Sequence, residues 1–409
     1  MKCDKPHQGR RAPTTGYSHA AKTALQETTR RVSEMHQAIA GKSFDLLRRI
    51  PLVAGPAQLV RSVHDAIAAG VYAAIHHAGG SLLDAAAIVE RHYPRRTGAA
   101  TPPGKLASGL RSALNGAFGD YLVSTDSRLA IDMAIHAGGV ALPLTADALR
   151  VAFPDAGRRL CLFVHGLACD EHGWDPGDAA ATSPVHFGRR LREEFSYTPL
   201  YLRYNSGLPI ARNGAHLAAL LEELMAVWPV PVGDLVVIGH SMGGLVALAA
   251  CEAAAQAGLG WPRATRMLIC LGSPHLGSAL ERLGELTNAL LDRSAVTAPL
   301  GRIAAARSQG IKDLGQGPGS PTMSPGHAHI AFRFLGASLT DKLEHPIGRF
   351  LGDGLVSLRS ATGHAIDGDV QSAQLGGLGH LALLNDPRVY RQISEWVGAL
   401  PRSGSALGT

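Results

Sequence analysis

Two patterns of apolar and polar positions follow one another along the chain, and the change lies near residue 130. Before it, apolar side chains recur mostly at helical spacing, and prolines or glycines interrupt the pattern. This part predicts helices over residues 21–49, 56–78, 82–92 and 106–118. After it, short apolar runs alternate with helical stretches, which predicts βαβ units around a mainly parallel sheet, an α/β fold.

Continuous apolar runs identify the strands expected at the centre of this sheet, because helices cover both faces of a parallel sheet. The runs predicted as strands are 160–164, 200–204, 235–238, 266–271 and 329–335. Residues 214–228 carry leucines along one helical face, and residues after Pro387 show a similar pattern near the C-terminus. The sequence therefore predicts strands and helices in alternation up to about residue 400.

The third of these apolar runs continues into Gly239-His240-Ser241-Met242-Gly243, and a small-residue run follows. A serine on such a sharp strand-to-helix turn stands clear of the sheet, and the helix behind it favours negative charge near its oxygen. A side chain at either flanking glycine would crowd the turn. Ser241 is therefore the candidate nucleophile; the alternative is a glycine-rich turn that only packs.

A serine hydroxyl needs a general base, and the base needs an orienting carboxylate. When the serine lies on such an elbow, the chain order is serine, acid, histidine. Asp353, between Gly352 and Gly354, follows the strand at 329–335 and is the candidate acid. Rival carboxylates without this context are Asp313, Asp341, Asp367 and Asp369.

His380 lies on a glycine-containing loop before the last helix, and this position makes it the candidate base. His364 is the alternative. His275 comes too early in the chain for this role and is interpreted as pocket wall or loop support.

The oxyanion of a tetrahedral intermediate needs two preorganised donors. One is the backbone amide after the nucleophile, Met242, and the other should follow an early strand. The loop His165-Gly166-Leu167 follows the strand at 160–164, so the Leu167 amide is the candidate. His165 and Gly166 are expected to support this turn, as Gly239, His240 and Gly243 support the elbow.

These motifs, in this order, resemble the α/β-hydrolase superfamily and, more narrowly, bacterial lipases and esterases and the GPI inositol-deacylase-like branch. The quoted sequences are Val164-His165-Gly166-Leu167, the elbow, Ser273-Pro274-His275-Leu276-Gly277-Ser278, Gly352-Asp353-Gly354-Leu355-Val356-Ser357 and Gly379-His380. The resemblance covers residues 130–400. It implies a serine carboxylic-ester hydrolase that forms an acyl-enzyme from a small-molecule or lipid ester.

The same three catalytic residues would also serve an acyltransferase, thioesterase or amidase, and a non-catalytic binding protein is a further alternative. Some secreted lipases carry a calcium-binding aspartate shortly after the histidine, but Leu-Ala-Leu-Leu follows His380 here. Histidines are dispersed without metal-ligand spacing, so no metal and no cofactor is expected.

The positive charge of the chain is concentrated near its N-terminal end. The net charge is +6, and residues 1–50 hold ten lysines and arginines against four acidic residues, so the rest is balanced. A basic arm of this kind is a solvated tail or contacts anionic lipid, and nucleic-acid binding is not expected. Five scattered cysteines indicate no disulfide framework, and no apolar leader is seen, so a cytoplasmic location is expected.

The expected domains are a disordered basic arm over 1–20, a helical N-terminal region over 21–125, an α/β-hydrolase domain over 126–400 and a flexible tail over 401–409. Within the third, residues 277–327 form an insertion with leucines at helical spacing and a glycine- and proline-rich end. An insertion of this length is typical of a lid, although a plain amphipathic helix on the core fits the leucines equally well.

Overall fold

The computed structural model describes residues 105–175 except 125 and 128, and residues 185–276, 308–316, 328–343, 352–362 and 368–401. The chain divides into two compact units, Met1–Thr101 and Pro102–Thr409. In the first unit only Ser33, Gln37, Arg61 and Asp65 are described, and all four are helical, as the sequence predicts at these positions. The predicted basic arm over 1–20 and the helix over 82–92 lie outside the described residues.

The second unit is built on an eight-stranded sheet with the order β2-β1-β4-β3-β5-β6-β7-β8. Strands β3 to β8 run parallel, whereas β1 pairs antiparallel with both β2 and β4. The predicted mostly parallel α/β-hydrolase fold is confirmed. The strands are β1 Ala134–Ala137, β2 Val140–Ala141, β3 Arg159–Val164, β4 Thr198–Arg203, β5 Asp234–His240, β6 Thr265–Leu271, β7 Ala331–Ala337 and β8 Val370–Leu375.

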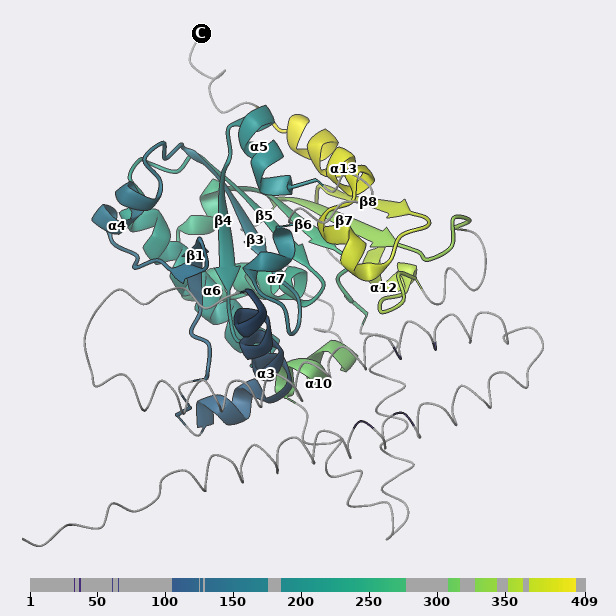
Figure 1. The fold of residues 1–409 in the computed structure, drawn as a ribbon. Coiled ribbons are helices and arrows are strands. Elements are labelled where there is room, and N and C mark those ends of the chain that lie inside the picture. The colour runs from purple at the N-terminus through teal and green to yellow at the C-terminus, as the bar shows by residue number, and fades with distance from the viewer. Residues whose placement is uncertain are drawn as a thin grey trace, which may run out of the picture. The chain divides into compact units, whose positions relative to one another are not determined.

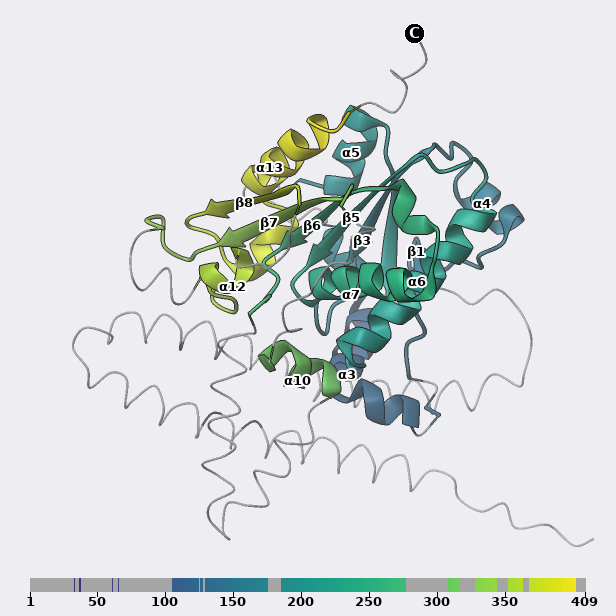
Figure 2. The same ribbon diagram turned by 180° about the vertical axis from the view of Figure 1, so that it is seen from behind.

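Helices cover both faces of this sheet, with α5 and α13 on one face and α6 and α7 on the other (Figures 1 and 2). Helices α3 and α10 lie side by side beyond α6 and α7. The helices are α3 Lys105–Ser124, α4 Ala146–Ala152, α5 Phe187–Phe195, α6 Ile210–Val227, α7 Met242–Ala257, α10 Gln309–Gln316, α12 Leu358–Thr362 and α13 Pro387–Gly398. Short 3-10 helices are η1 Glu171–Trp174, η2 Trp261–Ala264 and η4 His380–Leu384.

The two faces of the sheet form two separate apolar cores, because successive side chains of a strand point to opposite sides. In β3, Leu160, Leu162 and Val164 pack with residues of α6 and α7, whereas Cys161 and Phe163 pack with residues of α5 and α13. Burial on both faces explains why the central strands read as continuous apolar runs. None of the described helices combines the length and the hydropathy that crossing a bilayer requires.

A buried cluster of charged side chains ties the loop after β3 to β4 and β1. Arg203 of β4 donates to both carboxylate oxygens of Glu171, at 2.6 and 2.5 Å, and His136 Nδ1 of β1 lies 3.4 Å from the same carboxylate. Burial alone would raise the pKa of Glu171, but the adjacent His136 ring and the hydrogen bonds from Arg203 outweigh it and lower the pKa to about 2. The loop is thereby fixed by an ionised, fully paired carboxylate.

Helix α3 is the first element of the second unit, although the sequence pattern grouped it with the helical region over 21–125. Its Ser108 hydroxyl donates to Asp170 at 2.6 Å, beside the charged cluster. The helix bends at Phe118, whose backbone is not helical. Two carbonyls near this bend accept hydrogen bonds from Ser308. Its hydroxyl donates to the Gly116 carbonyl at 2.6 Å, and its amide donates to the Ala117 carbonyl at 3.0 Å.

We expect the Arg203→Ala variant to lose about 3–5 kcal/mol of its free energy of unfolding, because the Glu171 charge would remain buried without its main partner. The control is Arg150→Ala, which breaks an ion pair with Asp147 whose side chains are 61% and 96% exposed. This control should change stability by less than about 1 kcal/mol. Urea unfolding of both variants tests the expectation, and equal losses would contradict it.

The depressed pKa of Glu171 also predicts how stability depends on pH. The folded carboxylate titrates near 2 and the unfolded one near its ordinary 4.5, so its contribution is complete above pH 4.5 and is lost as pH falls toward 2. The unfolding temperature of Glu171→Gln should therefore fall less steeply than that of the parent protein over this range. Parallel curves would show that Glu171 does not carry this dependence.

Candidate active site

Ser241 occupies a strained turn between β5 and α7. Its φ of 54° and ψ of −124° lie in a region that residues with a side chain seldom adopt. Its amide donates to the carbonyl of Leu271 at 2.8 Å, and its carbonyl accepts from Gly244 at 3.1 Å. Hydrogen bonds to β6 and to the first turn of α7 thus hold the unfavourable conformation.

The glycines on either side of Ser241 allow the helix to approach the sheet. A Cβ on Gly239 would lie 2.4 Å from the nitrogen of Gly244, and one on Gly243 would lie 2.3 Å from the carbonyl oxygen of Val164. Both distances are shorter than real contacts, so only glycine fits. The first turn of α7 therefore lies directly against β3 and β5, with Met242 as its first residue.

Asp353 and His380 form a buried hydrogen-bonded pair on the loops that follow β7 and β8. His380 Nδ1 lies 2.7 Å from Asp353 Oδ2, and the His380 amide donates to the Asp353 carbonyl at 3.1 Å. The other carboxylate oxygen accepts the amides of Leu355 and Val356 at 3.0 and 2.8 Å. Both oxygens of this buried carboxylate are therefore occupied by donors.

This pairing decides which nitrogen of His380 carries the proton. An ionised carboxylate only accepts hydrogen bonds, so Nδ1 must donate to Asp353. In the neutral ring, Nε2 then carries the lone pair and can accept a proton from a hydroxyl group. The pair has the arrangement that a general base and its orienting acid require.

Ser241 and His380 approach two adjacent residues at the end of β6. The Ser241 amide binds the carbonyl of Leu271, and the next residue, Gly272, lies beneath the Asp353–His380 pair. A Cβ on Gly272 would be 2.6 Å from Leu383 Cδ1, 3.1 Å from Asp353 Oδ2 and 3.3 Å from His380 Cε1. Gly272 also has a φ of 59°. No local pattern in the sequence marks Gly272, because its importance comes from residues far away along the chain.

His240 joins the elbow to the loop that carries His380. Its Nε2 donates to the His380 carbonyl at 3.1 Å, and the two rings lie 4.6 Å apart. Burial, together with the neighbouring His380, lowers the pKa of His240 well below its ordinary value, so the ring is neutral. The residue predicted to support the elbow thus also contacts the histidine loop.

The loop after β3 lies directly beside Ser241. A Cβ on Gly166 would be 3.1 Å from Ser241 Cβ, so the backbone approaches the serine closely. His165 accepts the Tyr204 amide at Nε2 (3.3 Å), and its Nδ1 lies 2.8 Å from the Gly166 carbonyl. Burial lowers its pKa to about 4, although the hydrogen bond to Gly166 opposes this shift. A neutral His165 therefore braces the turn that carries Leu167.

The rival residues have other partners or positions. Asp313 of α10 accepts the Ile210 amide at 2.9 Å, Asp369 pairs with Arg333 at 2.9 Å, and Asp341 is exposed. His275 is buried, and its amide donates to the carbonyls of Ser273 and Ser360. Its ring is perpendicular to that of Phe334, with the ring centroids 4.8 Å apart, which fits loop support. His364 and Asp367 lie outside the described residues.

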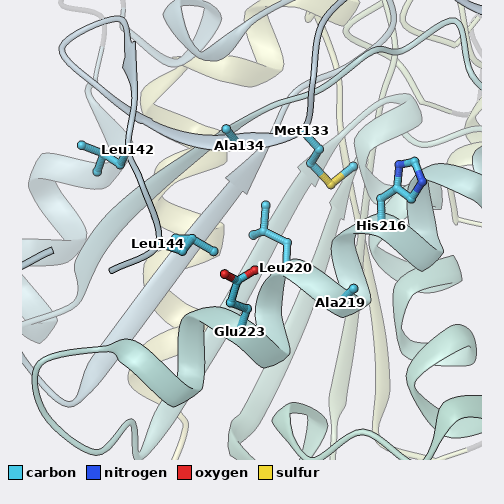
Figure 3. Close-up of a pocket in the computed structure, with 8 residues that line it drawn as sticks. All are labelled: Met133, Ala134, Leu142, Leu144, His216, Ala219, Leu220 and Glu223. Carbon is cyan, nitrogen blue, oxygen red and sulfur yellow. The ribbon is translucent and has the colours of Figure 1, made fainter. Parts of the chain in front are cut away.

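A hollow of about 460 Å³ lies elsewhere, between α6 and the β1–β2 end of the sheet. Residues of α6, among them His216, Leu220 and Glu223, line it on one side, and Met133, just before β1, lines it on the other (Figure 3). None of its lining residues is among the predicted site residues. Within the described part of the chain, no group of three or more histidine, cysteine or acidic side chains has an arrangement that would hold a metal ion.

Comparison with known proteins agrees with this architecture. Residues 218–293 match the family described as PGAP1-like alpha/beta domain, and this segment contains β5, the elbow and β6. No curated protein matches the chain. The match and the sheet topology confirm the predicted resemblance to the α/β-hydrolase superfamily.

Several solved structures are similar at low identity. The mature form of Bacillus licheniformis lipase BlEst2 is 17% identical over 59% of this chain and 93% of that one, with a TM-score of 0.40. A thermophilic esterase from Thermogutta terrifontis is 18% identical over 59% and 89%, with a TM-score of 0.35. RedJ, a thioesterase of the prodiginine pathway in Streptomyces coelicolor, is 16% identical over 59% and 86%, with a TM-score of 0.35.

We expect Gly272→Ala to disturb the Asp353–His380 hydrogen bond, because the new methyl group would overlap Leu383 and press on both partners. Gly258→Ala is the matched control, since Gly258 has a similar φ of 66° but nothing within 4 Å of an added Cβ. Both variants place a side chain at a similar left-handed φ. The low-field proton resonance of the His380 ring should shift or disappear in Gly272→Ala only, and identical spectra would contradict the packing argument.

Proposed function

We propose that this chain is a serine carboxylic-ester hydrolase with Ser241 as nucleophile, His380 as general base and Asp353 as orienting acid. The observation that carries the proposal is the buried 2.7 Å hydrogen bond between His380 and Asp353. This pair lies against Gly272, and the preceding residue, Leu271, binds the amide of Ser241 on its strained elbow. The chain order of serine, acid and histidine supports the proposal.

In the proposed mechanism, His380 Nε2 accepts the proton of the Ser241 hydroxyl as the serine oxygen attacks the ester carbonyl. The amides of Leu167 and Met242 donate to the oxygen that becomes negatively charged. The imidazolium then protonates the leaving alcohol, and the acyl group remains on Ser241. His380 next removes a proton from water, which attacks the acyl-enzyme and releases the acid. Asp353 stabilises the imidazolium in both steps.

We further propose that the acyl group of the substrate is apolar. Leu381, directly after His380, is 59% exposed, and Leu276, after β6, is 45% exposed. Helix α10 lies close to Met242, the residue after Ser241, since a Cβ on Gly310 would be 3.0 Å from the end of the Met242 side chain. Helix α10 belongs to the predicted lid insertion 277–327, and most of that insertion lies outside the described residues.

The cytoplasmic location and the contact of the basic arm with anionic lipid stay predictions, because residues 1–50 are described at two positions only.

Acyl transfer, thioester hydrolysis and amide hydrolysis use the same three residues. Product analysis with added alcohol or amine acceptors separates transfer from hydrolysis.

Ser241→Ala should lower kcat/KM for p-nitrophenyl esters by roughly 10⁴-fold or more, because the variant lacks the nucleophile. Ser394→Ala on α13 is the control and should leave hydrolysis unchanged. A fluorophosphonate probe should label the parent protein and the control but not Ser241→Ala. Full ester hydrolysis by folded Ser241→Ala would refute the mechanism, and an absence of labelling in the folded parent protein would favour a binding role.

A further inference from the structure

The loop that carries Leu167 contains a second strained residue. Ala168 has a φ of 59°, a left-handed conformation that costs free energy in any residue with a side chain. Leu167 lies between this residue and Gly166, which is packed against Ser241. The direction of the Leu167 amide therefore depends on whatever holds Ala168 in this conformation.

Within the loop, the Cys169 amide donates to the Gly166 carbonyl at 3.3 Å and closes the turn around Ala168. Two further contacts hold Ala168 from outside the loop. Its amide donates to the hydroxyl of Ser206 at 2.9 Å, and Ser206 is 1% exposed in the loop after β4. On the other side lies Gly116 of α3, where an added Cβ would be 2.8 Å from both Cα and Cβ of Ala168. Ala168 is thus confined between a hydrogen bond and a close backbone approach.

Helix α3 is in turn fixed against the loops around the site. The carbonyl of Gly119 accepts the Asn205 side-chain amide at 3.0 Å, and a Cβ on Gly207 would be 2.1 Å from the Asn115 carbonyl. At the bend of α3, the carbonyls of Gly116 and Ala117 accept hydrogen bonds from Ser308, just before α10. The helix therefore cannot move away from Ala168 without breaking buried hydrogen bonds.

We propose that α3 is part of the apparatus that binds the oxyanion, and that Gly116 and Ser206 are positioning residues for the Leu167 amide. This inference rests on the proposed hydrolase function. Neither residue touches the substrate: Ser206 anchors the amide of Ala168, and Gly116 limits how far the loop can shift. An oxyanion-hole donor is effective only when it is fixed before charge develops, so a small displacement weakens it.

The test compares Gly116→Ala and Ser206→Ala with the parent protein and with Gly109→Ala. Gly109 lies about two turns before Gly116 in α3 and has nothing within 4 Å of an added Cβ, which makes it the matched control. Ser206→Ala introduces no overlap, so it tests the same idea if Gly116→Ala fails to fold. Circular dichroism and thermal unfolding establish which variants are folded.

Each folded protein is assayed on a p-nitrophenyl ester and on the corresponding thionoester. Sulfur accepts hydrogen bonds poorly, so the preference for the oxygen ester reports the strength of the oxyanion hole. We expect Gly116→Ala and Ser206→Ala to lower kcat on the oxygen ester by roughly 10-fold to 100-fold with little change in KM. Their preference for oxygen over sulfur should fall by a similar factor, and Gly109→Ala should match the parent protein.

A general loss of structure would lower the rates on both substrates equally and leave the preference unchanged. That result, or unchanged rates in both folded variants, would overturn the role of α3. If the parent protein does not hydrolyse esters, or if Ser241→Ala retains activity, the proposed function fails first and this inference falls with it. If Ser241→Ala is inactive but the preference stays constant, only the inference about α3 fails.

Discussion

The hydrogen bond between His380 Nδ1 and Asp353 Oδ2 is the interaction on which the site depends. A buried carboxylate is costly unless donors occupy its oxygens, and here two backbone amides and one imidazole do so. The pair fixes the ring tautomer and joins the loops after β7 and β8. Gly272 leaves room for it at the end of β6, and the same strand end binds the Ser241 amide. The conformation of the Ser241 elbow, the packing around Gly272 and the position of the His380 proton thus all depend on the same small region.

Much of this arrangement could be predicted from the sequence, because its signals are local. Buried parallel strands give continuous apolar runs, and these identified β3, β4, β5, β6 and β7 to within about two residues. The pairing of Asp353 with His380 was predicted from chain order and from the glycines around the acid. The chemistry of the pair depends on a turn and a loop that the sequence marks clearly.

Other features could not be read in this way, because they exist only in the folded chain. Strands β1, β2 and β8 are short or half-exposed and lack an apolar run, so no pattern predicted them. The close approach of Gly116 to Ala168 joins residues on α3 and on the loop after β3, which no local signal connects. The ion pair of Glu171 and Arg203 likewise depends on the partner strand.

That ion pair has a consequence for the response of the site to heat. The cost of removing charged groups from water decreases as temperature rises, whereas the gain from burying apolar surface levels off. The cluster of Glu171, Arg203 and His136 joins the segment after β3, which also carries Leu167, to β4 and β1. On warming, the electrostatic support of this loop therefore strengthens relative to the two apolar cores that hold the sheet.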